Sequence, residues 1–423
     1  MENRMYLCID LKSFYASVEC VERGLDPMKT NLIVADPERS EKTICLAVTP
    51  AMKKLGVKNR CRVFEIPKNI DYITAEPRMQ KYIDYAAEIY AVYLTFVSKD
   101  DVFVYSIDEV FIDVTDYLRM YNMTAKQLAR KMMDEVLDKV GVRATCGIGT
   151  NLYLAKIALD ITAKHAEDFI GYLDEDLFVK TLWQHRPLTD FWRIGKGTAK
   201  RLSQMGIYTM EGIAKCNEDL LYNKFGIDAE LLIDHAWGKE PTTMRDIKEY
   251  KPKTTCLTSG QVLMRDYEFD EGEIIAKEMM DLLCLEMVEK GVLTKSITLY
   301  VGYSNRLDVE PAGGSIAPDT PTNNDALLLP LISKLYKRIV NPEYPVRRMN
   351  ISCNNLVDES EIFEQLSLFD EPKSISKHKK IQKAMVDIKK QFGKNAVFKG
   401  MDLDKSATTL ERNRQIGGHK SGE

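Results

Sequence analysis

Two groups of acidic residues stand where they could bind a metal ion. Asp10 follows the apolar run 5–9, and Asp108 and Glu109 follow the apolar run 102–105. Both runs are rich in β-forming residues, so we expect these carboxylates at the ends of two buried strands. Carboxylates that converge in this way repel one another unless a cation lies between them. Carboxylate and phosphate oxygens share a preference for Mg²⁺, so the pattern predicts in-line displacement at phosphorus by two metal ions.

The elements around these acids predict an α+β fold, with an antiparallel or mixed sheet and helices on one face. A strand over 4–10 leads into a helix over 13–23. The next elements are strands 32–35 and 44–48, helices 50–55 and 79–98, a hairpin of 102–105 with 110–114, helix 124–139 and strand 142–148. Asp108 and Glu109 therefore lie near the turn of a hairpin. Asp113 and Asp116, just downstream, are interpreted as turn or cap residues.

From about residue 170 the pattern changes to short helices. The stretch 193–202 has the form of a helix-hairpin-helix, in which a Gly-x-Gly turn exposes backbone N–H groups. Such a turn binds a phosphate without reading base sequence. An ordinary turn between two helices is the alternative interpretation. The candidate DNA-binding residues are Ile194, Gly195, Lys196 and Gly197.

The rest of the chain predicts a second α+β domain and a tail. Polar residues 244–253 indicate a linker, and 254–355 indicate a small separate domain. Its expected elements are a first strand, helix 269–290, strand 296–303, a Gly/Pro-rich loop 311–323, helix 325–340 and strand 346–353. After about residue 358 the chain is polar, and we expect it to be loosely ordered apart from a helix near 377–391.

Composition narrows the class of protein. The 423 residues predict two to four domains, and 45% hydrophobic with 29% charged residues is typical of a globular protein. No run approaches the roughly 18 apolar residues of a membrane span, and the N-terminus lacks a signal-peptide pattern. Nine cysteines without a Cys-x-x-Cys pair disfavour a disulfide framework or a zinc site. These features predict a cytoplasmic protein that does not contact a membrane.

Charge is distributed unevenly along the chain. The formal net charge is −4, yet residues 373–423 hold 13 Lys and Arg against 5 Asp and Glu. The basic tail is either a solvated segment or a surface that contacts DNA or a partner. An acidic body can still carry a positive groove. Candidate groove residues are Lys196, Lys200, Arg201, Lys253, Arg347 and Arg348.

The order of the motifs resembles the Y-family translesion DNA polymerases. The motifs are the stretch 10–19, the stretch 106–109, Cys146-Gly147-Ile148-Gly149 with 154–158, the hairpin 194–197, and Phe225-Gly226 with Ala236-Trp237-Gly238. The resemblance covers roughly residues 4–355. It is strongest to the UmuC-like branch of Gram-positive bacteria and their mobile elements, which the tail stretches 407–413 and 416–419 also resemble.

This resemblance implies a right-handed polymerase of low fidelity that copies past damaged bases in the SOS response. It implies a ferredoxin-like palm, small fingers, a helical thumb with the helix-hairpin-helix, and an α+β little finger. The implied boundaries are palm 1–20 and 75–168, fingers 21–74, thumb 169–243, linker 244–253, little finger 254–355 and tail 356–423. Primer–template DNA and a dNTP would be the substrates.

The resemblance also assigns roles to residues. Asp10, Asp108 and Glu109, with the backbone carbonyl of Leu11, would hold two Mg²⁺ ions. Tyr15 matches the steric gate against ribonucleotides, and Phe14 beside it would pack under the sugar or in the core. Lys53 and Lys164 match cations that hold the triphosphate. The chain departs from the commonest family pattern, which has tyrosine at the position of Pro50 and arginine at that of Lys53. For Lys156 a structural role and a contact with primer phosphate both stay open.

A second specific motif is the pentapeptide Gln365-Leu366-Ser367-Leu368-Phe369. It has the form by which bacterial polymerases bind the sliding clamp, with Leu366, Leu368 and Phe369 as apolar anchors and Gln365 fixing the register. A small hydrophobic patch that folds back on the body is the alternative. UmuC-like enzymes can also depend on partners of the UmuD or RecA type, and the sequence does not decide this.

Two other classes of protein compete with a polymerase. A catalytically idle module that binds DNA and the clamp would lack Asp10, Asp108 or Glu109, but all three are present. A nucleotide cyclase also uses paired carboxylates, but it has no thumb hairpin, clamp peptide or little finger. The sequence therefore favours the polymerase.

Overall fold

The computed structural model describes residues 4–252, 255–361 and 372–422. The chain divides into two compact units. The N-terminal unit comprises residues 1–250 and 419–423, and the C-terminal unit comprises residues 251–418. Among the helices of the described residues, none is long and apolar enough to cross a membrane.

The N-terminal unit is built on a five-stranded sheet with β1 (Tyr6–Leu11) at its centre. The strand order is β5-β6-β1-β7-β8, with β5 Val102–Val104, β6 Glu109–Asp113, β7 Ala144–Gly149 and β8 Ile170–Leu173. Neighbouring strands are antiparallel except β7 and β8, which are parallel. The predicted mixed sheet and the predicted hairpin are therefore confirmed.

Helices cover both faces of this sheet, which corrects the prediction of helices on one face. On one side, Leu11 and α3 (Met79–Tyr93) line a common cavity. On the other side, Cys8 belongs to a hydrophobic cluster with residues of α6 (Leu152–Ile157). Because side chains alternate along a strand, Asp10 points to the same side as Cys8, toward α6.

Two glycines of β7 allow α6 to lie close to the sheet. A Cβ at Gly147 would lie 2.1 Å from the carbonyl oxygen of Ala155, and a Cβ at Gly149 would lie 2.1 Å from the Ala155 nitrogen. Any side chain there would push α6 off the sheet. The Cys146-Gly147-Ile148-Gly149 motif thus positions the helix that carries Lys156.

A small three-stranded sheet is formed by strands between residues 32 and 75. Its order is β3-β2-β4, with β2 Leu32–Val34, β3 Ala47–Val48 and β4 Ile73–Ala75. Helix α2 (Pro50–Lys54) packs on it and begins where the Thr49 hydroxyl accepts a hydrogen bond from the Met52 N–H. This cap and the proline at the first helical position explain why the short helix forms there.

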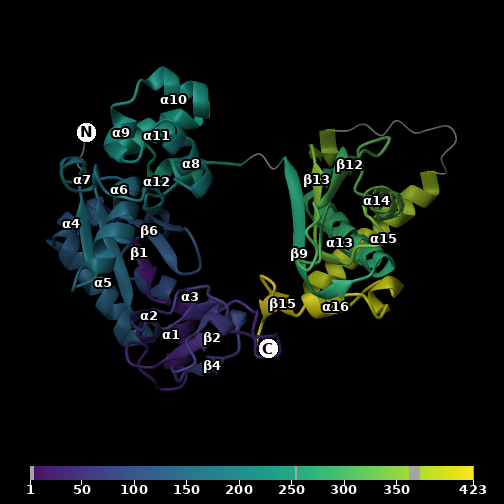
Figure 1. Ribbon diagram of the computed structural model, residues 1–423, viewed down its shortest axis with the longest axis horizontal. Coiled ribbons are helices and arrows are strands. Elements are labelled where there is room, and N and C mark those ends of the chain that lie inside the picture. Colours follow the sequence, from purple (N-terminus) through teal and green to yellow (C-terminus); the bar gives the residue numbers. More distant parts are fainter. Residues whose placement is uncertain (1–3, 253–254, 362–371, 423) are drawn as a thin grey trace. The chain divides into compact units, whose positions relative to one another are not determined.

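The remaining helices of the N-terminal unit complete its core. They are α1 Phe14–Val21, α4 Thr115–Tyr121, α5 Ala125–Val140, α7 Glu175–Leu182, α8 Lys196–Gln204, α9 Met210–Ala214, α10 Glu218–Phe225 and α11 Asp228–Ala236. Helices α8 to α11 gather in one group (Figure 1). They share a hydrophobic cluster with Tyr153 and Leu154 of α6.

Part of the expected linker 244–253 is a packed helix. Met244–Glu249 form α12, which begins with a capping box between Thr243 and Asp246. Met244 is buried in the cluster that also contains Cys8 and residues of α6. The pattern around Met244 is too polar to predict this helix, because only Met244 and Ile247 face the core.

The C-terminal unit is a four-stranded antiparallel sheet with two helices against it (Figure 1). The strand order is β12-β11-β13-β9, with β9 Cys256–Tyr267, β11 Ser296–Tyr303, β12 Ala312–Ile316 and β13 Val346–Asn354. The helices are α13 (Phe269–Lys290) and α14 (Asp325–Ile339). The predicted helices and strands of 254–355 are confirmed, with one addition.

The addition is strand β12, which lies inside the expected loop 311–323. It pairs with β11, with Gly314 opposite Leu299. A Cβ at Gly314 would lie 2.8 Å from a side-chain carbon of Ile339, so the glycine lets α14 pack on this edge. Glycines that usually indicate a loop serve close packing here.

The described part of the tail is folded, which corrects the expectation of a loosely ordered segment. The predicted helix is present as α15 (Pro372–Phe392), and its Met385 and Val386 pack against Leu285 of α13. Further along, the Glu278 carboxylate accepts hydrogen bonds from the backbone N–H groups of α16 (Thr409–Arg412) and its N-terminal flank. Short strands β10 Val292–Leu293, β14 Val357–Asp358, β15 Gln415–Ile416 and β16 His419–Lys420 complete the chain.

The last residues belong to the N-terminal unit. The Lys420 ammonium lies 2.7 Å from the Glu38 carboxylate and also pairs with Glu76. The Gln80 N–H, in the first turn of α3, donates to the Ser421 carbonyl at 2.9 Å. The chain end is thus held by acidic side chains and by a helix N-terminus.

Candidate active site

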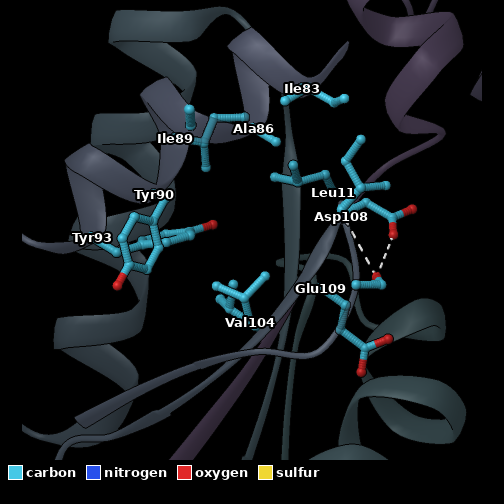
Figure 2. Close-up of a pocket in the computed structure, with 13 residues that line it drawn as sticks. Leu11, Ile83, Ala86, Ile89, Tyr90, Tyr93, Val104, Asp108 and Glu109 are labelled. Carbon is cyan, nitrogen blue, oxygen red and sulfur yellow. Dashed lines mark hydrogen bonds between the residues drawn. The ribbon is translucent and has the colours of Figure 1, made fainter. Parts of the chain in front are cut away.

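The three predicted acidic residues are neighbours where β1 and β6 lie side by side. Asp10 and Glu109 are directly opposite each other in the strand register. The next backbone hydrogen bond runs from the Leu11 N–H to the Asp108 carbonyl at 2.9 Å. Figure 2 shows the carboxylates of Asp108 and Glu109 pointing away from the apolar residues of α3. Strand pairing therefore brings together residues that are about a hundred positions apart in the sequence.

The electrostatics of this cluster are those of crowded anions. Burial, followed by the charges of Asp108 and Glu109, raises the pKa of Asp10 to about 7. Lys164 and Lys156 lower it, but by less. An acid with a pKa raised in this way is stabilised in its charged form when a cation binds beside it in place of the proton.

Glu109 is held by a lysine and a thiol. The Lys156 ammonium lies 2.9 Å from the Glu109 carboxylate and 3.0 Å from that of Asp160. The Cys8 thiol donates to Glu109 at 3.2 Å. Burial alone would lower the pKa of Lys156, but the neighbouring acidic groups raise it above its usual value. Of the two roles left open for Lys156, the observed contacts are those of the structural one.

Asp108 is oriented by its own turn. The Ser106 hydroxyl donates to the Asp108 carboxylate at 2.7 Å (Figure 2). Behind the turn lies a cavity of about 300 Å³ between α3 and the β5–β6 hairpin. Its lining is mostly apolar, with Leu11, Ile83 and Tyr90 among its residues. Asp108 and Glu109 also line this cavity, so the acids lie at the edge of an otherwise mostly apolar space.

The donor set suits a hard cation, although the side chains are not assembled around one. Carboxylate and carbonyl oxygens are the ligands that Mg²⁺ prefers. In the described part of the chain, no group of three or more His, Cys, Asp or Glu side chains is close enough to hold a metal ion as it stands. Glu109 is instead paired with Lys156, and Asp108 accepts a hydrogen bond from Ser106.

The expected steric gate is a stacked aromatic residue. The Tyr15 ring stacks on Tyr82, with centroids 4.4 Å apart and planes 15° apart. Burial raises the pKa of Tyr15, and the charge of Asp108 raises it further, so the ring is an electrostatic neighbour of the acid cluster. Phe14, the alternative under the sugar, is only 3% exposed and belongs to the core.

A network not predicted from the sequence supports this ring. The Tyr82 hydroxyl donates to Glu19 at 2.9 Å, and the Arg78 guanidinium donates to both oxygens of Glu19 at 2.9 Å. Glu19 is fully buried. The sequence offered one signal for this network, because Glu19 ends the motif 10–19. A buried acid in a motif needs a cation beside it.

Three lysines surround the acid cluster. Burial lowers the pKa of Lys53, and Asp10, Lys164 and Asp108 are its electrostatic neighbours. Lys164 pairs with Asp160 at 3.0 Å. Lys12 was missed by the sequence reasoning, although burial and then Lys53 lower its pKa. Cations that crowd together beside carboxylates form a site for an anion with several charges.

The hairpin at 194–197 differs from the expected form in one respect. Helix α8 begins at Lys196 with Gly195 as its cap, but the element before the turn is a single 3₁₀ turn, Leu188–Asp190. Ile194 is buried, whereas a Cβ at Gly195 or Gly197 would meet no atom within 4 Å. The turn is thus open at its glycines.

Two of the basic residues predicted to line a DNA-binding groove contact other side chains of the protein. Arg347 lies 3.6 Å from Asp266, and the Arg201 guanidinium lies over the Phe225 ring. Lys253 and the pentapeptide 365–369 lie outside the described residues.

Comparison with known proteins shows the family of this chain. Residues 9–160 match the impB/mucB/samB family, and residues 258–368 match the C-terminal domain of the same family. The chain belongs to this family and is a UmuC-like DNA polymerase of the Y-family. The idle-module and cyclase interpretations are thereby set aside.

Two curated relatives and one solved structure illustrate the likeness. The chain is 31% identical to the "Putative UV-damage repair protein UvrX" of Bacillus subtilis (strain 168), over 98% of this chain and 97% of that one. It is 29% identical to "DNA polymerase IV 2" of the same organism, over 99% of both chains. The fold is similar to a "Y-family DNA polymerase chimera Dbh-Dpo4(243-245)-Dbh", with a TM-score of 0.61, 19% identity, and coverage of 84% of this chain and 99% of that one.

Proposed function

We propose that this polymerase adds dNTPs to a primer 3′-hydroxyl with low fidelity, directed by a template, and copies past damaged bases in the SOS response. The observation that carries the proposal is that Asp10, Asp108 and Glu109 occupy neighbouring positions across β1 and β6. Three acids at one place, one of them with a pKa raised to about 7, need divalent cations.

We assign two Mg²⁺ ions to Asp10, Asp108, Glu109 and the Leu11 carbonyl. When bound, the ions would lower the pKa of the primer hydroxyl and neutralise the leaving pyrophosphate. The chain's own residues prepare this site. Lys156 and Cys8 hold the Glu109 carboxylate, and Ser106 orients that of Asp108. Release of Glu109 from Lys156 would free both its oxygens as ligands.

The incoming nucleotide would lie beside the acids. Lys53 and Lys164 would contact the triphosphate, since both are electrostatic neighbours of Asp10. The Tyr15 ring, backed by Tyr82, would lie under the sugar and leave no room for a 2′-hydroxyl. The Gly195–Gly197 turn would bind a backbone phosphate of the DNA.

We assign the palm to 1–20 and 75–168, the fingers to 21–74, the thumb to 169–243 and the little finger to 254–355. The pentapeptide 365–369 would bind the sliding clamp, and tethering would compensate for a weak grip on DNA. Partners of the UmuD or RecA type, on which UmuC-like enzymes can depend, are tested as additions to the extension assay below. We expect the enzyme to act in the cytoplasm, where its DNA substrate lies.

Primer extension tests the proposal. Purified protein with Mg²⁺ and dNTPs should extend a primer on an undamaged template and past an abasic site, in short and error-prone steps. Asp108→Ala/Glu109→Ala should do neither while it still binds DNA. Absence of extension by the wild type, even with clamp and accessory proteins, would refute the proposal.

A further inference from the structure

Two cysteines lie opposite each other in the segment 43–63. Ile44 and Arg62 form an antiparallel bridge. The Cys45 N–H donates to the Cys61 carbonyl at 2.8 Å, one step along the same pairing. The Cys61 N–H donates to the Lys58 carbonyl, so one of the two possible hydrogen bonds of this pair forms. Residues that face each other on antiparallel strands have Cα atoms about 4.5–5.5 Å apart. A disulfide needs Cα atoms about 4.4–6.8 Å apart, so the backbone already meets this requirement.

The two side chains also point to the same side. Both belong to one hydrophobic cluster, in which Cys45 is fully buried and Cys61 is partly buried. Burial raises the pKa of Cys45 to about 12, and the neighbouring Cys61 thiol contributes to the rise. The thiols are therefore neighbours inside the cluster, and one of them reaches solvent.

Another neighbouring pair lacks this access. Cys284 and Cys353 influence each other electrostatically in the C-terminal unit, yet both are fully buried. An oxidant cannot reach either thiol without unfolding of the unit. In the pair of Cys45 and Cys61, by contrast, one of the two neighbouring thiols is partly exposed.

We propose that Cys45 and Cys61 form a reversible disulfide, which makes the segment a redox modification site. Hydrogen peroxide, the oxidant we name, first oxidises the Cys61 thiolate to a sulfenic acid and is reduced to water. The Cys45 sulfur then attacks the Cys61 sulfur, the S–S bond forms, and the hydroxyl leaves as water with the Cys45 proton. Two thiols lose two electrons and two protons in total, and one peroxide yields two waters.

The bond would join the two ends of the loop that carries α2. Lys53 lies in this helix, and Met52 of the same helix lies in the cluster with Cys45. One of the two sulfurs is partly exposed, so a reductant can reach the bond, and accessible disulfides are the labile, regulatory ones. Reduction by a thiol would restore the pair.

Peptide mapping tests the proposal on the full-length protein. Trypsin cleaves after Lys42, Lys53, Arg60 and Arg62, so the disulfide would link peptide 43–53 to peptide 61–62. After brief peroxide treatment and alkylation of the remaining thiols, we expect this linked pair, two hydrogens lighter than the sum. Dithiothreitol should separate it. Cys256→Ser, which removes an exposed cysteine elsewhere, should give the same map.

Two variants distinguish pairing from simple reactivity. In Cys45→Ser, the Cys61 sulfenic acid should persist and be trapped by dimedone at least about fivefold more than in the wild type. Cys61→Ser should leave Cys45 reduced. The proposal is overturned when both thiols of the folded, peroxide-treated wild type are still alkylated after denaturation, or when Cys61 is linked to a different cysteine.

Discussion

The Lys156 ammonium lies 2.9 Å from the Glu109 carboxylate, and both side chains are about nine-tenths buried. Lys156 therefore balances one of the three acids of the site and connects α6 to the end of β6. Glycines 147 and 149 make this possible, because they let the helix approach the sheet. The lysine is a positioning residue for an acid that we assign to metal binding.

Replacement of this lysine should destabilise the protein. Lys156→Met leaves the buried Glu109 without its cation, whereas Asp160 keeps Lys164. Removal of one partner from a buried pair costs about 3–5 kcal/mol. We expect the free energy of unfolding in urea to fall by that order at pH 7.5. Lys156→Arg, which keeps the charge, should lose much less. Equal stability of Lys156→Met and wild type would refute the positioning role.

The Gly147 position offers a sharp packing test. Gly147→Ala places a Cβ 2.1 Å from the Ala155 carbonyl oxygen, so α6 must shift. We expect a loss of about 1–3 kcal/mol or more in the free energy of unfolding, together with weaker primer extension. Gly197→Ala is the matched control for folding, since its Cβ meets no atom within 4 Å. A Gly147→Ala protein as stable as Gly197→Ala would contradict the close packing.

Stability of the metal-free protein should depend on pH through Asp10. Its pKa is 3.8 in the unfolded chain and about 7 in the folded protein, so the folded state binds the proton more tightly. The stabilisation is complete below pH 3.8 and is lost as pH rises through about 7. The charges that face Asp10 are Asp108, Glu109, Lys164 and Lys156.

We therefore expect the Tm in a chelator to fall as pH rises from 5 to 8. The fall corresponds to a loss of about 2–4 kcal/mol in the free energy of unfolding. Addition of Mg²⁺ should raise the Tm more at pH 8 than at pH 5.5, because the cation replaces the proton. Asp10→Asn should show a flatter profile and a smaller effect of Mg²⁺. A wild-type profile as flat as that of Asp10→Asn would count against the raised pKa.

Sugar selectivity should depend on Tyr15. Tyr15→Ala opens the space that we assign under the sugar, so ribonucleotide incorporation relative to deoxyribonucleotide should rise at least about tenfold. Tyr82→Phe keeps the stacking ring and removes only its hydrogen bond to Glu19, and it should change selectivity much less. Single-nucleotide incorporation with dCTP and CTP measures the ratio. An unchanged ratio in Tyr15→Ala would place the gate elsewhere.

The sequence predicted the elements whose patterns are strongly periodic. Helix 269–290 and strand 296–303 match α13 and β11 to the residue, and the acidic hairpin lies where expected. Helix α12 and strand β12 were missed, because one has few core residues and the other contains two glycines. The packed tail after α15 was missed because several of its contacts are polar, such as that of Glu278 with the N–H groups around Thr409.

Within the site, the sequence motifs identified the acidic residues but not the side chains that contact them. Pairs such as Lys156 with Glu109, or Tyr82 with Glu19, join residues far apart in sequence, and no local pattern connects them. Lys156 lies on α6, the helix after Asn151. Which acid it pairs with depends on how closely α6 packs against β7. Such contacts follow from packing between elements and appear only in the folded chain.

The most direct test of the central claim is the rate of single-nucleotide incorporation as a function of Mg²⁺ concentration. Wild type would be compared with Asp10→Asn, Glu109→Gln and the control Asp113→Asn, whose carboxylate lies on β6 but caps Thr115. We predict a loss of at least about 1000-fold for the first two, since a metal ligand supplies several kcal/mol, and nearly wild-type rates for the control. Wild-type rates and Mg²⁺ dependence in Asp10→Asn and Glu109→Gln would contradict the assignment of these acids to the catalytic ions.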